Sequence, residues 1–288
     1  MQPAPTKLLE SYELAVAPME LSDVPKLHEL SISVSWPQRP EDWALLIGLG
    51  QGIVARDEIG RVLGSAMWFP LGEHHASIGM VITSPRLQEY GTGRWLMGHI
   101  FDQVGARGKV LTATRAAYRL YISLGFVPLS PSFQLQGIVS GVRPGPQYAR
   151  AMQDGDRAAI HRLDSEAMGV ARPEVIERLL SVSTGTVVER DGKITGFALC
   201  REHGRGHVVG PVVAENDDDA IALSVPFVQA MQGRFLRFDT RQPDGAFRAF
   251  LQASGIQLYD TVMQMGLGDL PEATVPAKIY ALVSQALG

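Results

Sequence analysis

The sequence predicts an α/β protein made of two tandem copies of one unit, each a mixed, mostly antiparallel sheet flanked by helices. Three observations lead to this prediction. The chain has 288 residues, about twice the length of an ordinary domain. Short segments of the first half return in the same order in the second half, about 130 residues later. Segments with the alternating apolar pattern of strands are interspersed with segments that have helical apolar spacing.

The internal repeat rests on six pairs of matching segments. The pairs begin at Met19 and Met152, Gly60 and Gly192, Gly79 and Gly210, Gly108 and Gly233, Leu124 and Ser254, and Phe133 and Met263. Each match is weak alone, but six in the same order indicate duplication. The stretch 140–146 is rich in Gly and Pro and is typical of a linker. We therefore expect domains over residues 1–141 and 147–288.

The first copy contains recognisable strands, helices and turns. Strand patterns cover residues 12–18, 52–56, 62–69, 76–83, 109–113, 126–129 and 133–139. Ser22 or Asp23 can cap a first helix, and a second short helix is expected over 41–48. A turn at 57–60 predicts a hairpin between the strands on either side.

Two further helices follow in the first copy, and one is expected near the end of the sequence. Apolar residues spaced i, i+3, i+4 and i+7 predict a helix through 97–104. Residues 115–124 form the next predicted helix, which Gly125 would end. Residues 271–287 place apolar side chains partly on one face, so an amphipathic helix is expected there.

Composition excludes several classes of protein. A net charge of -4 gives no general attraction to nucleic acid. Cys200 is the only cysteine, which rules out an intramolecular disulfide and a cysteine-rich zinc site. No apolar run is long enough to span a membrane, and no signal peptide is evident, so a cytoplasmic protein without a membrane partner is expected. We also expect no bound metal, because the acidic run 217–219 is more typical of helix capping than of a calcium site.

One loop of the first copy has the composition of an anion site. Gln88-Glu-Tyr-Gly91-Thr-Gly93 leads from a strand directly into a helix. Glycines let the backbone approach a ligand, and the free N–H groups of a helix start bind phosphates. The same pattern also suits an ordinary turn before a helix. No Gly-Lys-Ser/Thr follows, so the loop is not a P-loop.

The order of motifs around this loop resembles the GNAT superfamily of acyl-CoA-dependent N-acyltransferases. The family pattern (Gln/Arg)-x-x-Gly-x-(Gly/Ala) matches 88–93, and Tyr121 stands four residues before Gly125-Phe126, as in the family. The resemblance covers residues 12–139 well and 148–267 as a weaker copy. It implies that strand 79–82 diverges from strand 109–113, so that free backbone groups can pair with the pantetheine arm.

The resemblance also implies the residues that contact the co-substrate, acetyl-CoA or another acyl-CoA. These are Met80, Val81, Ile82, Gln88, Glu89, Tyr90, Gly91, Thr92, Gly93, Arg94 and Thr114. Thr114 is a departure, because the family often has Asn at this position. In the implied mechanism, an amine attacks the thioester directly in a ternary complex, and a backbone N–H near 80–82 polarises the thioester carbonyl. Tyr121 would protonate the leaving thiolate, with Tyr118 as the alternative.

The sequence gives less specific evidence for the general base. Glu73, His74 and His75 lie at the start of a strand where bases of the family are often found, and Glu73 and His75 are the candidates. Histidine titrates in the right range for this task. An exposed polar turn is the competing interpretation, and water could relay the proton instead.

The second copy departs from the family pattern at the loop. It is six residues shorter between Val213 and Gly233 than the first copy is in the matching stretch, and it has acidic residues in place of glycines. Carboxylates cap an empty helix well but repel a pyrophosphate. The Tyr121 position falls on Phe250 or Leu251, so we expect only one acyl-CoA site per chain.

Three functions remain open at this point. The first is an N-acetyltransferase that acts on a small-molecule amine or on a protein or peptide amine, with a homodimer as a possible assembly. The second is an acyl-CoA-binding regulator or scaffold without turnover. The third, an aminoacyl transferase that uses charged tRNA, is disfavoured because the chain is acidic.

Overall fold

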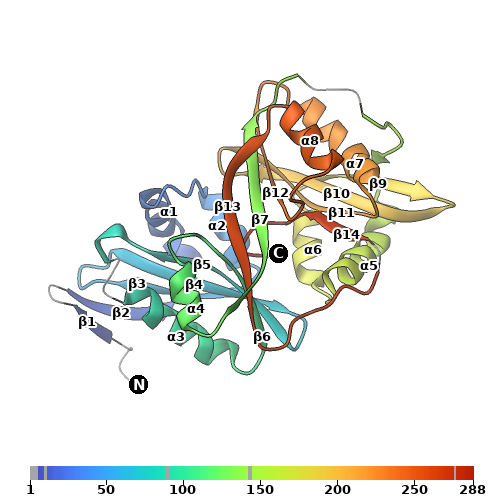
Figure 1. Cartoon of the computed structure of the whole chain (residues 1–288). Coiled ribbons are helices and arrows are strands. Elements are labelled where there is room, and N and C mark those ends of the chain that lie inside the picture. Colours follow the sequence, from blue (N-terminus) through green and yellow to red (C-terminus); the bar gives the residue numbers. More distant parts are fainter. Residues whose placement is uncertain (1–5, 10–11, 88–90, 142–144, 276) are drawn as a thin grey trace. The chain divides into compact units, whose positions relative to one another are not determined.

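The computed structural model describes residues 6–9, 12–87, 91–141, 145–275 and 277–288. The chain divides into two compact units, residues 1–109 and 110–288 (Figure 1). Each unit is described by itself below. The domain limits 1–141 and 147–288 follow the repeat in the sequence and stay a prediction.

The first unit is an antiparallel sheet whose strands follow the order of the sequence, β1-β2-β3-β4-β5. Its strands are β1 (Thr6–Leu9), β2 (Tyr12–Pro18), β3 (Gln51–Arg56), β4 (Val62–Leu71) and β5 (His75–Thr83). Its helices are α1 (Val24–Ser33), α2 (Pro40–Ile47) and α3 (Thr92–Val104), with short 3₁₀ turns at Leu21–Asp23 and Pro85–Leu87. Helices α1 and α2 cover one face of this sheet and α3 covers the other (Figure 1).

The second unit contains the mixed sheet β13-β7-β12-β14-β11-β10-β9-β8. Its strands after β6 (Gly108–Ala113), where the division into units falls, are β7 (Val127–Ile138), β8 (Arg150–Ala151), β9 (Thr184–Arg190), β10 (Lys193–His203), β11 (Gly206–Ala214), β12 (Phe235–Thr240), β13 (Gln257–Leu267) and β14 (Lys278–Ala281). Its helices are α4 (Tyr118–Ser123), α5 (Arg157–Met168), α6 (Pro173–Leu180), α7 (Asp217–Ala230) and α8 (Ala246–Ala253), with a 3₁₀ turn at Asp154–Asp156.

The element order confirms the duplication. In both copies a strand leads through a 3₁₀ turn to two helices, a three-stranded meander, a helix, a strand, a helix and a long strand. The entry to the first helix is built in the same way each time. The Glu20 N–H donates to Asp23 Oδ2 (3.0 Å), and the Gln153 N–H donates to Asp156 Oδ2 (2.8 Å). These carboxylates satisfy N–H groups that a helix start leaves without partners.

The long strand of the first copy pairs with strands of the second. Residues 126–129 and 133–139 were expected as two strands, but β7 runs continuously from Val127 to Ile138. It pairs antiparallel with both β12 and β13. Leu135, opposite Phe238 on one side and Leu258 on the other, is fully buried. Burial of such apolar side chains stabilises the pairing.

The expected helix over 271–287 is wrong. Residues 278–281 form strand β14, and the following residues form turns. The apolar residues that suggested a helix face, including Ile279, Leu282 and Leu287, are all buried in the second unit. Pairing of β14 with β11 and β12 replaces the hydrogen bonds of a helix, so tertiary structure overrides the local pattern here.

Candidate functional site

A β-bulge interrupts strand β5. Ser65 of β4 pairs with Ile82 and Met67 pairs with Gly79, so Ala66 alone faces two residues, Met80 and Val81. A bulge of this kind leaves its extra residue outside the ladder, and bulges are frequent beside active sites. The bulge therefore frees backbone groups of β5 at the residues predicted to contact the thioester.

The backbone of the bulge is strained, and a hydrogen bond from strand β4 fixes it. Met80 has a φ of +52°, in the left-handed region, which a residue other than glycine adopts at a cost of about 1–2 kcal/mol. The buried Ser65 hydroxyl donates a hydrogen bond of 2.8 Å to the Met80 carbonyl oxygen. Because this carbonyl is fixed, the amide groups on either side of it have a defined orientation.

Helix α3 begins at the predicted phosphate loop. Gly91 is its N-cap residue, with a φ of +69°, and the Gly91 carbonyl accepts the first helical hydrogen bond from the Trp95 N–H (3.1 Å). The N–H groups of the first turn, which include those of Thr92 and Gly93, have no partner within an α-helix, and such groups commonly bind anions. Gln88, Glu89 and Tyr90 lie outside the described residues, so their roles stay predictions.

The helix start and the bulge belong to one piece of structure. Helix α3 packs on the sheet at Gly64, where a Cβ would lie 3.1 Å from Leu96 Cδ1 and 3.5 Å from the Ile82 carbonyl oxygen. Glycine at this position lets the first turns of α3 approach β5 just beyond the bulge. The structure therefore brings Leu96 of α3 and Ile82, at the end of the bulge, to the same glycine, and a common site formed by 80–82 and 91–94 stays a prediction.

Two polar groups at the helix start fit an anionic ligand. The Thr92 side chain is 1% exposed, and its hydroxyl oxygen has no hydrogen-bond partner among the described residues. A Cβ built on Gly91 would lie 3.4 Å from Lys7 Nζ, which places an ammonium group beside the loop. Burial lowers the pKa of Lys7. Sequence reasoning missed Lys7, because a lysine near the start of a chain has no local pattern that indicates a site.

The predicted bases lie at the other end of β5. Glu73 and His74 are exposed in the turn between β4 and β5, and His75 is half-buried. The Glu73 carbonyl oxygen accepts a hydrogen bond of 3.1 Å from Arg107 Nε. His75 precedes Met80 by five residues, which is about 16 Å of extended chain. The structure does not bring Glu73 or His75 next to the bulge, and their catalytic role stays a prediction.

Tyr121 and Thr114 belong to the second compact unit. Tyr121 is 5% exposed and packs edge-to-face on Phe126, with ring centroids 5.9 Å apart. Burial raises the pKa of Tyr121 above its usual value, so the phenol keeps its proton at neutral pH. The Thr114 hydroxyl accepts a hydrogen bond of 3.4 Å from the Ala117 N–H, before helix α4. The predicted roles of both residues stay predictions.

The matching loop of the second copy is filled by its own carboxylates. The Asn216 side chain accepts a hydrogen bond from the Asp219 N–H (2.9 Å), which caps helix α7. Burial alone would raise the pKa of Asp219, but its ion pair with Arg190 (2.7 Å) and the hydrogen bond from Tyr148 lower it. The start of α7 is therefore capped by a side chain of the chain itself, and the loss of acyl-CoA binding in the second copy stays a prediction.

Neither a metal centre nor a membrane span is found in the part of the chain that the structure describes. No three His, Cys, Asp or Glu side chains there are grouped so that they could hold a metal ion. No helix there is long and apolar enough to cross a bilayer.

The fold and the site define the class of an acetyltransferase of GNAT type. Two family models, each described as an acetyltransferase (GNAT) domain, match residues 49–128 and 160–281. The chain belongs to the GNAT superfamily and carries two of its domains in tandem. A comparison with curated protein sequences found no match.

Several solved structures share this fold. A putative acetyltransferase from Pyrococcus horikoshii superposes with a TM-score of 0.80 over 98% of both chains, at 16% identity. A GCN5-related N-acetyltransferase from Sphaerobacter thermophilus has a TM-score of 0.63, 19% identity, and coverage of 91% of this chain and 98% of its own. A tandem GNAT protein from the clavulanic acid biosynthesis pathway has a TM-score of 0.64, 15% identity, and coverage of 88% and 98%. At these identities the likeness concerns the fold.

Proposed function

We propose that this protein is an N-acetyltransferase that binds acetyl-CoA through its first unit and transfers the acetyl group to an amine. The observation that carries the proposal is the strained bulge at Met80 in β5 together with the glycine-capped start of helix α3, which packs on the same sheet. One element offers backbone donors for a thioester carbonyl, and the other offers donors for a pyrophosphate. Family membership supports the same reading.

In the proposed reaction, the acceptor nitrogen attacks the carbonyl carbon of the thioester and the carbon–sulfur bond breaks. A backbone N–H of residues 80–82 hydrogen-bonds to the carbonyl oxygen, where negative charge develops. Tyr121 gives its proton to the leaving thiolate, and water or a base at Glu73 or His75 takes the proton of the attacking amine. Holding both reactants in one complex can supply about 7–11 kcal/mol of the barrier.

The test is release of free CoA thiol from acetyl-CoA in the presence of small amines and of peptide amines. The protein itself contributes little background, because burial raises the pKa of its one thiol, Cys200, to about 12. Thiol release that depends on an amine supports the proposal. Binding of acetyl-CoA without release for any amine would favour the second candidate, a regulator. That candidate is favoured by the position of Glu73 and His75, far along β5 from the bulge.

Tyr121→Phe is expected to lower turnover by about 10²-fold or more, because a general acid contributes on the order of 10²–10⁴. Affinity for acetyl-CoA should change less than twofold, since only the phenol oxygen is removed. Steady-state turnover and equilibrium binding are measured on the same samples. Tyr118→Phe is the matched control and should keep most activity. Equal turnover of Tyr121→Phe and wild type would remove Tyr121 from the mechanism.

Lys7→Gln is expected to weaken CoA binding about tenfold, as loss of a charge-assisted contact costs about 1.5–3 kcal/mol. Pantetheine, which has no phosphate, should bind both proteins equally. Lys26→Gln is the matched control, because Lys26 lies beside another glycine of positive φ, Gly60, away from the loop. Equal CoA affinities of Lys7→Gln and Lys26→Gln would exclude Lys7 from the site.

The Lys7 contact should also depend on pH. A lysine binds an anion while it is protonated, and its lowered pKa means that the charge is lost at a lower pH than usual. CoA binding of the wild type should therefore weaken as the pH rises through that lowered pKa. Lys7→Arg, which keeps its charge, should hold its affinity over the same range. Identical pH profiles of the two proteins would contradict the assignment.

A further inference from the structure

Strands β11 and β12 of the second unit separate soon after they meet. They pair in parallel only through His207 with Leu236 and Val208 with Arg237. On the other side of β11, the ladder to β10 contains one extra residue, because Gly210 and Pro211 both lie opposite Leu199. We call the opening between β11 and β12 the second slot. Strands β11 and β12 correspond to β5 and β6 in the repeat, so the second slot is the counterpart of the opening that is expected to receive a pantetheine arm in the first copy.

Strand β14 closes the second slot. Ala281 pairs with Val212 of β11 and also with Thr240 of β12. The Leu282 N–H donates to the Asp239 carbonyl oxygen at 2.7 Å. A Cβ on Gly210 would lie 1.9 Å from the Leu282 carbonyl oxygen, so glycine is needed where the segment passes. The backbone groups that two diverging strands would offer to a ligand are thus used by the chain itself.

Tyr280 of the same segment reaches the start of helix α7. Its side chain is buried, and it belongs to the apolar cluster that contains residues of α7. The Tyr280 hydroxyl donates a hydrogen bond of 2.9 Å to Asp217 Oδ1, in the first turn of the helix. One segment therefore closes both parts of the second slot, the gap between the strands and the helix start.

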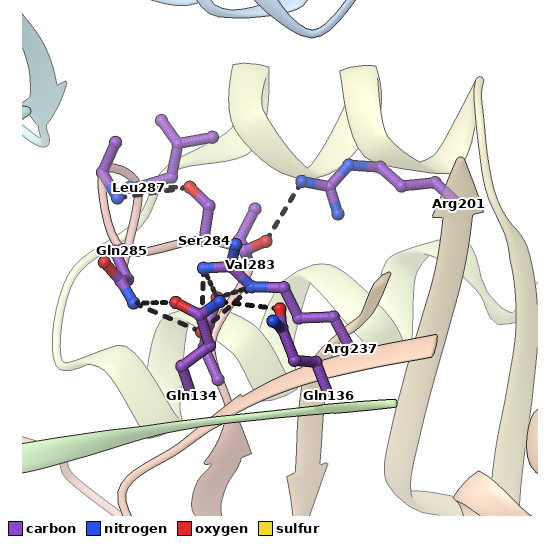
Figure 2. A network of polar contacts seen from close by, with 10 residues as sticks. Gln134, Gln136, Arg201, Arg237, Val283, Ser284, Gln285 and Leu287 are labelled. Carbon is purple, nitrogen blue, oxygen red and sulfur yellow. Dashed lines mark hydrogen bonds and ion pairs between the residues drawn. The ribbon is translucent and has the colours of Figure 1, made fainter. Parts of the chain in front are cut away.

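The residues after β14 are held by side chains of several elements (Figure 2). Arg201 of β10 donates to the Val283 carbonyl oxygen at 3.1 Å. The Gln285 amide donates to Gln134 Oε1 of β7 at 3.2 Å. Arg172, whose guanidinium forms a buried ion pair with Asp164 (2.8 Å), donates to the Leu287 carbonyl oxygen at 2.7 Å. The segment is thus held by strand pairing over 278–281 and by side-chain contacts to the turn that follows, the two kinds of interaction by which proteins bind peptides at a sheet edge.

We propose that the second slot is a binding site for a peptide that adds one strand, in place of acyl-CoA, and that residues 277–288 occupy it in cis, with 278–281 as that strand. The inference rests on contacts within the second unit and does not depend on the activity proposed for the first. It explains why the second copy could lose its glycine loop without losing its fold, since the segment supplies the interactions that a cofactor arm would make.

Hydrogen exchange of the full-length protein tests the closure directly. Without ligand, the amides of 279–283 should exchange at least 100-fold more slowly than those of the exposed residues Glu272 and Ala273. Acetyl-CoA should leave the exchange of 210–214 and 279–283 unchanged. Exchange of 279–283 as fast as that of these exposed residues, or faster exchange when acetyl-CoA is added, would overturn the proposal. If acetyl-CoA protects no amide at all, the proposed function fails. The exchange of 279–283 relative to the exposed residues, measured without ligand, still decides this inference.

A cleavage experiment tests whether the slot recognises the segment as a peptide. A protease site is inserted after the exposed residue Asp269 of the full chain, and the folded protein is cut there. The fragment should stay bound during gel filtration and should be replaced by a labelled synthetic peptide of 270–288. A peptide with Lys278→Gln, at an exposed position, should replace it equally well, and one with Ile279→Asp should not. Loss of the fragment at micromolar concentration, or equal exchange of the two variant peptides, would contradict the proposal.

Discussion

Gly91→Val is expected to lower acyl-CoA affinity at least about 100-fold, which corresponds to about 2.7 kcal/mol. Gly91 has a φ of +69°, a conformation that is a severe outlier for a β-branched residue. The backbone must rotate to relieve the strain, and this turns the N–H groups of the helix start away from the phosphate. The added side chain also lies against Lys7 Nζ. Calorimetric titration with CoA measures the change.

The matched control is Gly60→Val. Gly60 also has a positive φ, of +78°, and a Cβ there would likewise approach a lysine, at 3.8 Å from Lys26 Nζ. Both variants carry a similar strain in the first unit, so they should lose similar thermal stability. Only Gly91→Val should lose CoA binding. Asp218→Asn, at the start of α7 in the second unit, should leave binding unchanged. Equal affinities of Gly91→Val and Gly60→Val would show that the loop is not the phosphate site.

Deletion of Val81 is expected to lower acetyl transfer by about 10²–10³-fold, the effect of removing one oxyanion donor. The flanking pairs, Ser65 with Ile82 and Met67 with Gly79, stay in register because the deletion removes only the extra residue. The fold should therefore survive with a regular ladder in place of the bulge. Turnover with acetyl-CoA is compared with CoA affinity, which the start of α3 should largely preserve.

Met80→Gly is the control for the bulge. Glycine adopts the left-handed φ of Met80 without strain, so the bulge and its N–H groups should remain in place. Activity should stay within a few-fold of the wild type. Full activity after deletion of Val81 would show that the bulge has no part in catalysis, and an equal loss in Met80→Gly, which keeps the bulge, would contradict the assignment of the effect to the bulge.

The start of helix α3 could be predicted from sequence because its requirements are local. A glycine and polar residues before an apolar helical pattern can be recognised in the sequence, and α3 begins directly after Gly91 in the structure. The bulge could not be predicted in this way. Residues 77–82 have the alternation of an ordinary strand, and the extra residue is defined only by its partners on β4. Lys7 reaches the loop through pairing of β1 with β2, which is also a non-local event.

The two errors of the sequence prediction have a common physical cause. Residues 278–281 have an apolar pattern that suits a helix, but β11 and β12 leave unpaired backbone groups that a strand satisfies better. Similarly, residues 126–139 were divided into two strands, while partners on both sides hold β7 in one extended run. Strand pairing depends on segments far away in the sequence, so a local sequence pattern does not predict it.

The number of acyl-CoA molecules bound per chain tests the central claim most directly. Calorimetric titration of the full-length protein with acetyl-CoA should give one site, and Gly91→Val should reduce this to none. That result would place the site at the start of α3 in the first unit and leave the second slot to residues 277–288. Two sites per chain, or one site that survives in Gly91→Val, would contradict the account.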